Sequence, residues 1–268
     1  MKAMQTSRKE PDVMNHESNI RRVVLHFAME EEARGIAERC LLGEAEPLHP
    51  ALPARVRRGL VGDLEVIHCT NGIDPVHGVD RIGMEFAATT AWSTLSSFEP
   101  CIYINAGTCG GFTGRGGSIA RSYLGGGEFL IHDHRVPLPG FAELGQGRIP
   151  ATAFPAIETL LGIDSGPVSS GSSLDATPAE LDFFEREGVV AKDMEAAAIA
   201  TVTADWGVPF LAMKTVTDLV DHPEPSHEQF LRNLSSSSER LTDLLDELIR
   251  FIGSGTSVEA LQADAPRP

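Results

Sequence analysis

The chain of 268 residues is poor in positive charge and in long apolar runs, and each shortage excludes a class of protein. It has 22 lysines and arginines against 38 aspartates and glutamates, which gives a formal net charge of -16. Such an acidic chain is a poor general binder of nucleic acid or of anionic membranes. No apolar run approaches the length of a membrane span. We therefore expect no nucleic-acid partner and no membrane partner.

Cysteine is also scarce, and its spacing excludes a disulfide framework. None of the four cysteines forms a C-x-x-C pair, and three lie in apolar surroundings. We expect free thiols in a reducing compartment, which favours the cytoplasm. The four residues are Cys40, Cys69, Cys101 and Cys109.

Short apolar runs alternate with helical patterns along most of the chain. This alternation predicts one α/β domain over residues 20–253, with a mixed, largely parallel central sheet flanked by helices. A first strand is expected at 22–27, and a long amphipathic helix at 226–253. Residues 1–19 and 254–268 are expected to be disordered tails.

The stretch 189–221 carries acidic residues where its predicted elements meet loops. A short strand at 189–191 is followed by Asp193, a good helix N-cap, and by Glu195 in the first turn, where the helix dipole favours an anion. A buried strand is then expected at 210–216, interrupted only by Lys214, with Asp218 at its carboxyl end. An unpaired buried ammonium is costly, so Lys214 should have a carboxylate partner.

Other predicted strands end in segments that should open onto the same crevice, because ligands of α/β sheets bind at the carboxyl ends of the strands. These segments are 28–32, the glycine-rich loop 107–111 and the loop 171–175. The glycine-rich loop contains neither G-x-G-x-x-G nor a P-loop signature. The irregular segment 135–150 is expected to form a rim or lid.

The crevice would hold three acids, one cation and one hydroxyl, which are Glu32, Glu195, Asp218, Lys214 and Thr108. This set suits cleavage of a glycosyl bond, because one carboxylic acid can protonate the leaving group while another activates water. Composition alone does not identify the base that would leave.

Two other chemistries are disfavoured. The run His132-Asp133-His134 could suggest a metal site, but neighbouring residues of a strand point to opposite faces and no completing cluster is evident. Cys109 has no identifiable general base beside it, so it is not expected to act as a nucleophile. We expect neither a metal nor a cofactor.

Four motifs make the chain resemble the 5′-methylthioadenosine/S-adenosylhomocysteine nucleosidases of the nucleoside phosphorylase superfamily. They are AMEEEA at 28–33, INAGTCGGF at 104–112, DMEAAA at 193–198 and KTVTDLVD at 214–221. The sequences of the second and fourth motifs, and of HDHRVPLP at 132–139, are similar to those of the plant-type branch. Their order agrees with the family over 22–251.

The resemblance implies a role for each matching residue. Asp218 would protonate purine N7, oriented by Thr217, and Glu32 would be the base for the attacking water. Glu195 would bind the ribose hydroxyls. The remaining implied substrate contacts are Thr108 and Lys214 beside the water, Met194 under the sugar, the backbone around Leu174 at the adenine, and Met29, Ile73 and Phe230 around the sugar and alkylthio group.

The resemblance also implies that Lys214 is the electrostatic partner of Glu32, and that a second copy of the chain completes a homodimer. The chain departs from bacterial relatives, which commonly carry Ser and Arg where Thr108 and Lys214 stand. It also departs from the usual Met-Glu-Gly of the family, because Ala196 replaces the glycine. Residues 140–150 match the family poorly. Two alternatives stay open: a phosphorylase or other nucleosidase of the same fold, and a non-catalytic nucleoside-binding protein.

Overall fold

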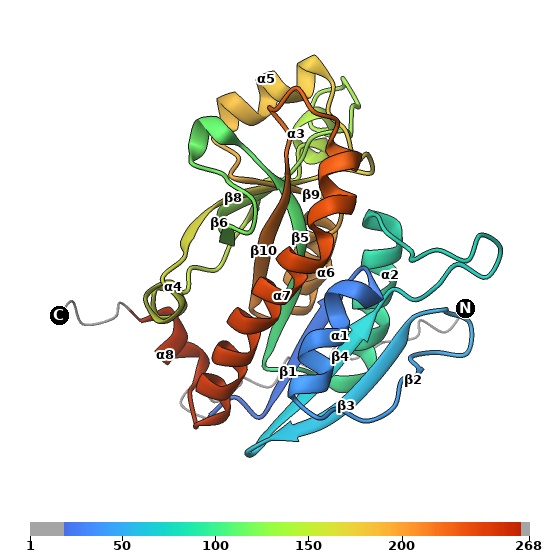
Figure 1. Ribbon diagram of the computed structural model, residues 1–268, viewed down its shortest axis with the longest axis vertical. Helices are drawn as coiled ribbons and strands as arrows, with labels where there is room; N and C mark the ends of the chain where they lie inside the picture. Colours follow the sequence, from blue (N-terminus) through green and yellow to red (C-terminus); the bar gives the residue numbers. More distant parts are fainter. Residues whose placement is uncertain (1–18, 264–268) are drawn as a thin grey trace, which may run out of the picture.

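The computed structural model describes residues 19–263. Its strands are β1 Arg22–Phe27, β2 Glu46–Pro47, β3 Arg55–Val61, β4 Leu64–Thr70, β5 Ile102–Gly111, β6 Ser122–Ile131, β7 Ile149–Pro150, β8 Asp164–Ser170, β9 Ala191–Asp193 and β10 Phe210–Leu219 (Figure 1). Its helices are α1 Glu30–Arg39, α2 Met84–Phe98, α3 Phe141–Gly145, α4 Pro155–Leu161, α5 Pro178–Glu187, α6 Ala196–Trp206, α7 Ser226–Gly253 and α8 Val258–Gln262, with a 3-10 turn at Thr113–Arg115.

Strand β5 lies at the centre of the sheet. It pairs in parallel with β1 and with β10, and its last residues also pair antiparallel with β9. From β10 the pairing continues through β6 and β8 back to β9, so these strands and β5 close into a ring. From β1 the sheet extends outward through β4, β3 and β2. The predicted mixed sheet is confirmed, with parallel pairing around β1 and antiparallel pairing at β10–β6 and β5–β9.

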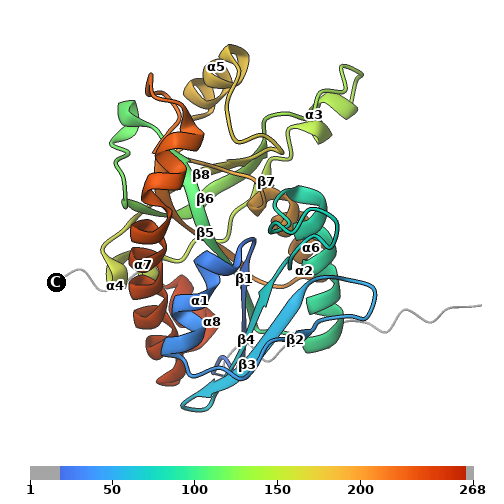
Figure 2. The ribbon, with the colours of Figure 1, turned by 45° about the vertical axis from the view of Figure 1, so that its right-hand side comes forward.

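Helices cover both faces of the sheet, and strand β1 shows why. Val23, Leu25 and Phe27 are buried in the core that β1 shares with α1 and α7. Val24 is buried in a second core, shared with α2 and α6. Successive side chains of a strand point to opposite faces, so β1 contributes to both cores. Figure 2 shows α1 and α7 on one side of the sheet and α2 and α6 on the other.

Strands β1, β4, β5 and β10 run in the same direction, so their carboxyl ends lie at one edge of the sheet. Strand β1 ends at this edge and α1 begins there at Glu30. Helix α7 also begins near it, and runs from there along the sheet to the opposite end of the molecule (Figure 1).

Two of the predicted strand ends are wrong. The segment 106–112 is expected to be a loop, yet β5 continues to Gly111 because β10 and β9 take up its backbone groups on both sides. Likewise β10 continues through Asp218 to Leu219. Glycine is compatible with these extended positions.

Helix α2 begins later than predicted. The sequence of residues 79–96 predicts a helix that starts at about Val79, but the residues before Met84 form a folded turn. An isolated bridge joins Ile73 to Asp80, and the backbone N–H of Arg81 donates to the carbonyl of Gly72 at 2.9 Å. These bonds hold the chain away from the helical path until Gly83.

The prediction of a disordered tail from residue 254 is wrong as far as Ala263. Ser257 forms a bridge with Asn19, the N–H of Ile20 donates to the carbonyl of Thr256 at 2.8 Å, and Leu261 of α8 is fully buried. Leu261 joins the core beside α7, and this burial stabilises the segment. The remaining expected tail residues, 1–18 and 264–268, lie outside the described part of the chain.

The segment 135–150, expected to be irregular, contains the short helix α3 and the two-residue strand β7 paired with β6. Within residues 19–263, no helix combines the length and the apolar character needed to cross a bilayer. All four cysteines are unpaired.

Candidate active site

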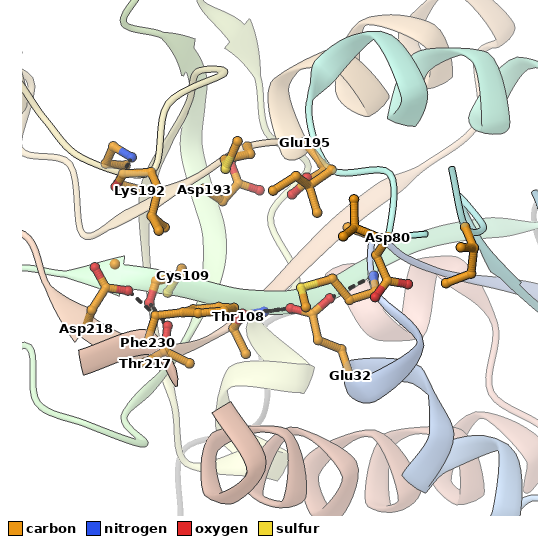
Figure 3. A pocket seen from close by; sticks show the side chains of 18 of the residues that line it. Glu32, Asp80, Thr108, Cys109, Lys192, Asp193, Glu195, Thr217, Asp218 and Phe230 are labelled. Carbon is orange, nitrogen blue, oxygen red and sulfur yellow. Dashed lines mark hydrogen bonds between the residues drawn. The ribbon is translucent and has the colours of Figure 1, made fainter. Parts of the chain in front are cut away.

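A cavity of about 520 Å³ opens at the sheet edge where the parallel strands end. Figure 3 shows its lining side chains projecting from several separate elements. The lining residues are Ala28, Met29, Glu32, Ile73, Gly78, Val79, Asp80, Ile82, Thr108, Cys109, Gly110, Leu174, Lys192, Asp193, Met194, Glu195, Thr217, Asp218 and Phe230. Ten of the eleven predicted site residues are among them, the exception being Lys214.

Glu32 enters the cavity from the first turn of α1. Its Oε1 accepts the backbone N–H of Thr108 at 2.6 Å and the Thr108 hydroxyl at 2.7 Å. Its Oε2 accepts the N–H of Met29 at 3.3 Å. A Cβ at Gly107 would lie 3.3 Å from Oε1, so the glycine lets the carboxylate rest on the strand. Burial raises the pKa of Glu32, although the two bonds from Thr108 oppose the rise.

Asp218 is held by an irregularity in β10. The register slips between Val216, which pairs with Cys109, and Asp218, which pairs with Gly110, and Thr217 is the extra residue. Such bulges redirect side chains and are common beside active sites. The Thr217 hydroxyl is 3.0 Å from Asp218 Oδ1, as expected for a residue that orients the acid.

Strand β5 also leaves room for Asp218. A Cβ at Gly110 would lie 3.2 Å from Asp218 Oδ2 and still closer to Val220. Burial raises the pKa of Asp218, against the hydrogen bonds from Ser226 and Thr217. A carboxyl group with a raised pKa keeps its proton to higher pH and can act as a general acid.

Glu195 lies at the N-cap of α6, not in its first turn as predicted, because pairing with β8 and β5 keeps the chain extended through Asp193. Its Oε1 accepts the N–H of Gly83 at 2.9 Å. Burial and the neighbouring Asp193 carboxylate raise its pKa to about 7. Asp193 still serves the helix start, since its Oδ2 accepts the N–H of Ala196 at 2.9 Å.

Lys214 does have the expected carboxylate partner, but the partner predicted by resemblance is wrong. Its Nζ lies 2.7 Å from Asp193 Oδ2, and both side chains are 1% exposed. The nearest donors of Glu32 are instead those of Thr108 and Met29. Burial opposes charge on both groups, yet Asp193 and Glu195 raise the pKa of Lys214, and Lys214 lowers that of Asp193. Lys214 therefore supports the site from behind the cavity wall.

The apolar wall agrees with the predicted set. Met29, Ile73, Leu174, Met194 and Phe230 all line the cavity. The sequence reasoning missed the apolar side chains of Val79 and Ile82, because it assigned the turn before α2 to a helix.

Three charged lining residues were also missed, namely Asp80, Lys192 and Asp193. Asp80 Oδ1 accepts the N–H of Glu30 at 3.1 Å and so connects the turn before α2 to the start of α1. Lys192 is buried in β9. A lysine and an aspartate side by side in a short buried strand were the signal that could have identified the last two.

The residues considered for other chemistry have structural partners. The Nδ1 of His132 is 3.0 Å from the Ser169 hydroxyl, and Asp133 Oδ2 accepts the N–H of Ser172 at 2.6 Å. Burial raises the pKa of Cys109 well above its usual value, which favours the neutral thiol. In the described part of the chain, no group of three or more His, Cys, Asp or Glu side chains is placed to hold a metal ion.

Comparison with known proteins agrees with this geometry. The family model described as the phosphorylase superfamily matches residues 22–250. The chain is 34% identical over 250 residues to a 5′-methylthioadenosine nucleosidase of Arabidopsis thaliana, covering 91% of this chain and 93% of the relative. It is 31% identical over 234 residues to a 5′-methylthioadenosine/S-adenosylhomocysteine nucleosidase of the same plant, covering 86% and 91%.

A solved structure shares the fold over nearly the same extent. The apo form of Arabidopsis thaliana 5′-methylthioadenosine nucleosidase superposes with a TM-score of 0.87 at 33% identity, covering 91% of this chain and 100% of that one. The predicted resemblance to plant nucleosidases is confirmed by these matches.

Proposed function

Because this chain belongs to the phosphorylase superfamily, we propose that it is an N-ribosyl hydrolase that cleaves the glycosidic bond of 5′-methylthioadenosine to adenine and the 5-thioribose product. The observation that carries the proposal is the pair of buried carboxyl groups, Glu32 and Asp218, that line one cavity from different strand ends. S-adenosylhomocysteine is the second substrate we propose, since one Arabidopsis relative is named for both nucleosides.

In the proposed reaction, the bond between C1′ and the purine breaks while water attacks C1′. Asp218 donates its proton to purine N7, and the bonding electrons leave with the adenine. Glu32 accepts a proton from the water, with the Thr108 hydroxyl and N–H holding its carboxylate in place. Negative charge from the site stabilises the oxocarbenium-like sugar.

Glu195 binds the two ribose hydroxyls in this proposal. An ionised carboxylate accepts hydrogen bonds from both, and Gly83 N–H fixes its orientation at 2.9 Å. Met194 packs under the sugar, the backbone around Leu174 contacts the adenine, and Met29, Ile73 and Phe230 surround the alkylthio group.

We also propose that the protein forms a homodimer and that it is located in the cytoplasm. Val76 and Val79 are 81% and 59% exposed on the turn that borders the cavity, and a second copy could cover them. Light scattering of the purified protein checks the dimer, and a monomer at all concentrations would contradict it.

The reaction class is tested by adenine release from 5′-methylthioadenosine in phosphate-free buffer. A hydrolase needs only water, whereas a phosphorylase needs phosphate beside C1′, where the Glu32 carboxylate would repel it. We expect full activity without phosphate; strict dependence on phosphate would exclude hydrolysis. A panel of adenine nucleosides that differ only at the 5′ substituent then ranks the substrates.

Asp218→Asn is expected to lower kcat by about 100- to 10,000-fold while nucleoside binding stays measurable, because the amide cannot donate a proton as an acid does. Single-turnover rates and calorimetric binding are the measurements. Turnover close to that of the unchanged enzyme would remove Asp218 from the role of acid.

Glu32→Gln is expected to lower kcat by a similar factor, because the amide cannot accept a proton from water. Glu31→Gln is the matched control, since Glu31 lies in the same helical turn but pairs with Arg34 at 2.7 Å on the surface. Equal rates for the two variants would show that another group activates the water.

A further inference from the structure

Lys192 is a buried cation in the cavity wall for which the proposed reaction has no role so far. Its side chain comes from β9 and the residue is 4% exposed. The ammonium donates to the carbonyl of Ser173 at 2.5 Å and to that of Leu174 at 3.0 Å. These carbonyls belong to the loop after β8, at the end of the cavity assigned to the base.

The strand register places Lys192 opposite Asp218. Gly110 of β5 pairs with Lys192 of β9 on one side and with Asp218 of β10 on the other. Residues opposite each other on neighbouring strands project to the same face of a sheet. The residue between them has no side chain, and Figure 3 shows Lys192 above Asp218 in the same part of the cavity.

The need to balance the buried positive charge of Lys192 also points to Asp218. A buried ammonium bonded only to neutral carbonyls is costly, so a carboxylate should accompany it. Asp193 is already paired with Lys214 and accepts from the Ser170 hydroxyl at 2.5 Å. Asp218 forms no salt bridge with a lysine or arginine in the described part of the chain, Lys192 included, so Lys192 acts on it through its charge and not through a direct bond.

We propose that Lys192 is a positioning residue, which fixes the carbonyls of Ser173 and Leu174 at the base end of the cavity and presents its positive charge to Asp218 across Gly110. The proposal rests on the hydrolase function above, because it assigns Lys192 to the control of the general acid.

The other charged groups around the pair do not replace this interaction. Lys192 also faces Asp193, Glu180 and Asp175, but its strongest charge interaction is with Asp218. Nearby His132 stays neutral, because burial and then Lys192 lower its pKa to about 4. Burial raises the pKa of Asp218; the hydrogen bonds from Ser226 and Thr217 oppose that rise, and the positive charge of Lys192 adds to their effect.

This interaction has a direct consequence for catalysis. Burial alone would make Asp218 a very weak acid that releases its proton reluctantly. The ammonium restores part of its acidity, so that the proton can pass to the purine near neutral pH.

The test removes the charge and follows the Asp218 carboxyl directly. Lys192→Met is expected to raise the pKa of Asp218 in the ligand-free protein by about one pKa unit, measured by carbon-13 NMR with the signal assigned from Asp218→Asn. Lys192→Gln, which keeps a donor for the carbonyls, should give the same rise, and it is available if the Met variant folds poorly. Arg250→Met removes an exposed cation at the far end of α7 and should leave the Asp218 pKa unchanged.

Kinetics supply the second readout. Asp218 must be protonated in the active form, so its higher pKa should move the alkaline limb of the kcat profile to higher pH in both charge-removing variants. KM should rise about tenfold in Lys192→Met, where the loop loses its two bonds, and less in Lys192→Gln. Lys192→Arg should restore the alkaline limb.

An unchanged Asp218 pKa in folded Lys192→Met and Lys192→Gln would overturn the proposal. So would a fall in kcat with no displacement of the alkaline limb, because a purely structural lysine would behave in that way. If the unaltered protein released no adenine, the hydrolase function would fail, and the NMR titration would still decide whether Lys192 acts on Asp218.

Discussion

Burial sets the acidity of the three carboxyl groups that the proposal assigns to the reaction. It raises the pKa of Glu32, Glu195 and Asp218, and the fixed donors around each group oppose that rise to different degrees. Three acids of similar intrinsic acidity can therefore hold protons differently at one pH. This separation allows one of them to act as an acid while the others accept hydrogen bonds or protons.

A consequence for stability can be tested at Glu195. Its pKa is raised from 4.5 to about 7, so the folded protein binds more protons than the unfolded chain between these values. Stability contributed by the neutral group is present at low pH and is lost as pH rises through about 7, by up to about 3 kcal/mol. Glu195→Gln should therefore be more stable than the unaltered protein at pH 8, and this difference should shrink toward pH 5.

Urea unfolding at both pH values measures the difference, and Glu228→Gln, an exposed glutamate of α7, is the control. The same Glu195→Gln variant should lose about 100-fold in kcat/KM, because it forfeits two hydrogen bonds to a charged group. Greater stability at pH 5 than at pH 8, relative to the unaltered protein, would contradict the assigned pKa.

Which residues could be predicted from sequence follows from how each is recognised. Glu32, Glu195 and Asp218 each lie within a contiguous motif, so their place at the site could be predicted. The partner of Lys214 could not, because Asp193 reaches it from another strand and no local pattern encodes the pair. The role of Lys192 could not be predicted either, because its position relative to Asp218 depends on the register of β9 and β10 with β5.

Among the elements, α7 does more than cover the sheet. Its polar side chains bind the backbone of β10 next to the acid: Asn233 Nδ2 donates to the carbonyl of Thr217 at 2.9 Å, and the Ser237 hydroxyl donates to that of Val216 at 2.8 Å. Gln229 accepts the N–H of Leu219 at 3.0 Å. The bulge that presents Asp218 is therefore fixed from the helix as well as from β5.

Gln229→Ala is expected to destabilise the protein by about 1–3 kcal/mol, because it removes the hydrogen bonds between the buried Gln229 amide and the partly buried backbone of Leu219 and Glu224. It should also lower kcat about tenfold with little change in KM, since the acid is displaced while the rest of the cavity remains. Leu231→Ala is the control on the exposed side of the same helix, where the side chain is 73% exposed. Chemical denaturation and steady-state kinetics are the measurements. Equal kcat values for the two variants would show that the hydrogen bonds from Gln229 do not position Asp218.

Elements with a clear periodicity were predicted well. The strand at Arg22–Phe27 and the helix at Ser226–Gly253 have the predicted bounds. The end of β5 was not predicted, because glycines usually indicate a loop. Here Gly107 and Gly110 remain in a strand and leave space for Glu32 and Asp218 above it. Local propensity does not contain that reason, which is a contact between distant segments.

On the scale of the whole molecule, the closed ring of β5, β10, β6, β8 and β9 leaves no free edge among these strands to pair with another chain. The last described residues also contribute to the packing of the molecule. Helix α8 packs near α4, and Leu261 fills part of the core. The sequence predicts a tail from residue 254, and the burial of Leu261 contradicts that prediction as far as Ala263.

Leu261→Ala should lower the free energy of unfolding by about 2–4 kcal/mol through the cavity it leaves, while KM stays unchanged because α8 is remote from the site. Gln262→Ala, at an exposed neighbouring position, should change stability by less than about 0.5 kcal/mol. A stability of Leu261→Ala equal to that of Gln262→Ala would show that the segment does not contribute to the fold.

The bond between Ile20 and Thr256 has a consequence for engineering the chain. It brings the two ends of the described part of the chain together at the amino end of β1, opposite the edge where the cavity opens. A short linker there could join the ends, and new ends could be opened at Gly62, in the turn between β3 and β4 at the same pole. Such a circular permutant would keep every cavity residue on an uncut segment, so the order of the chain could be changed without reaching the site.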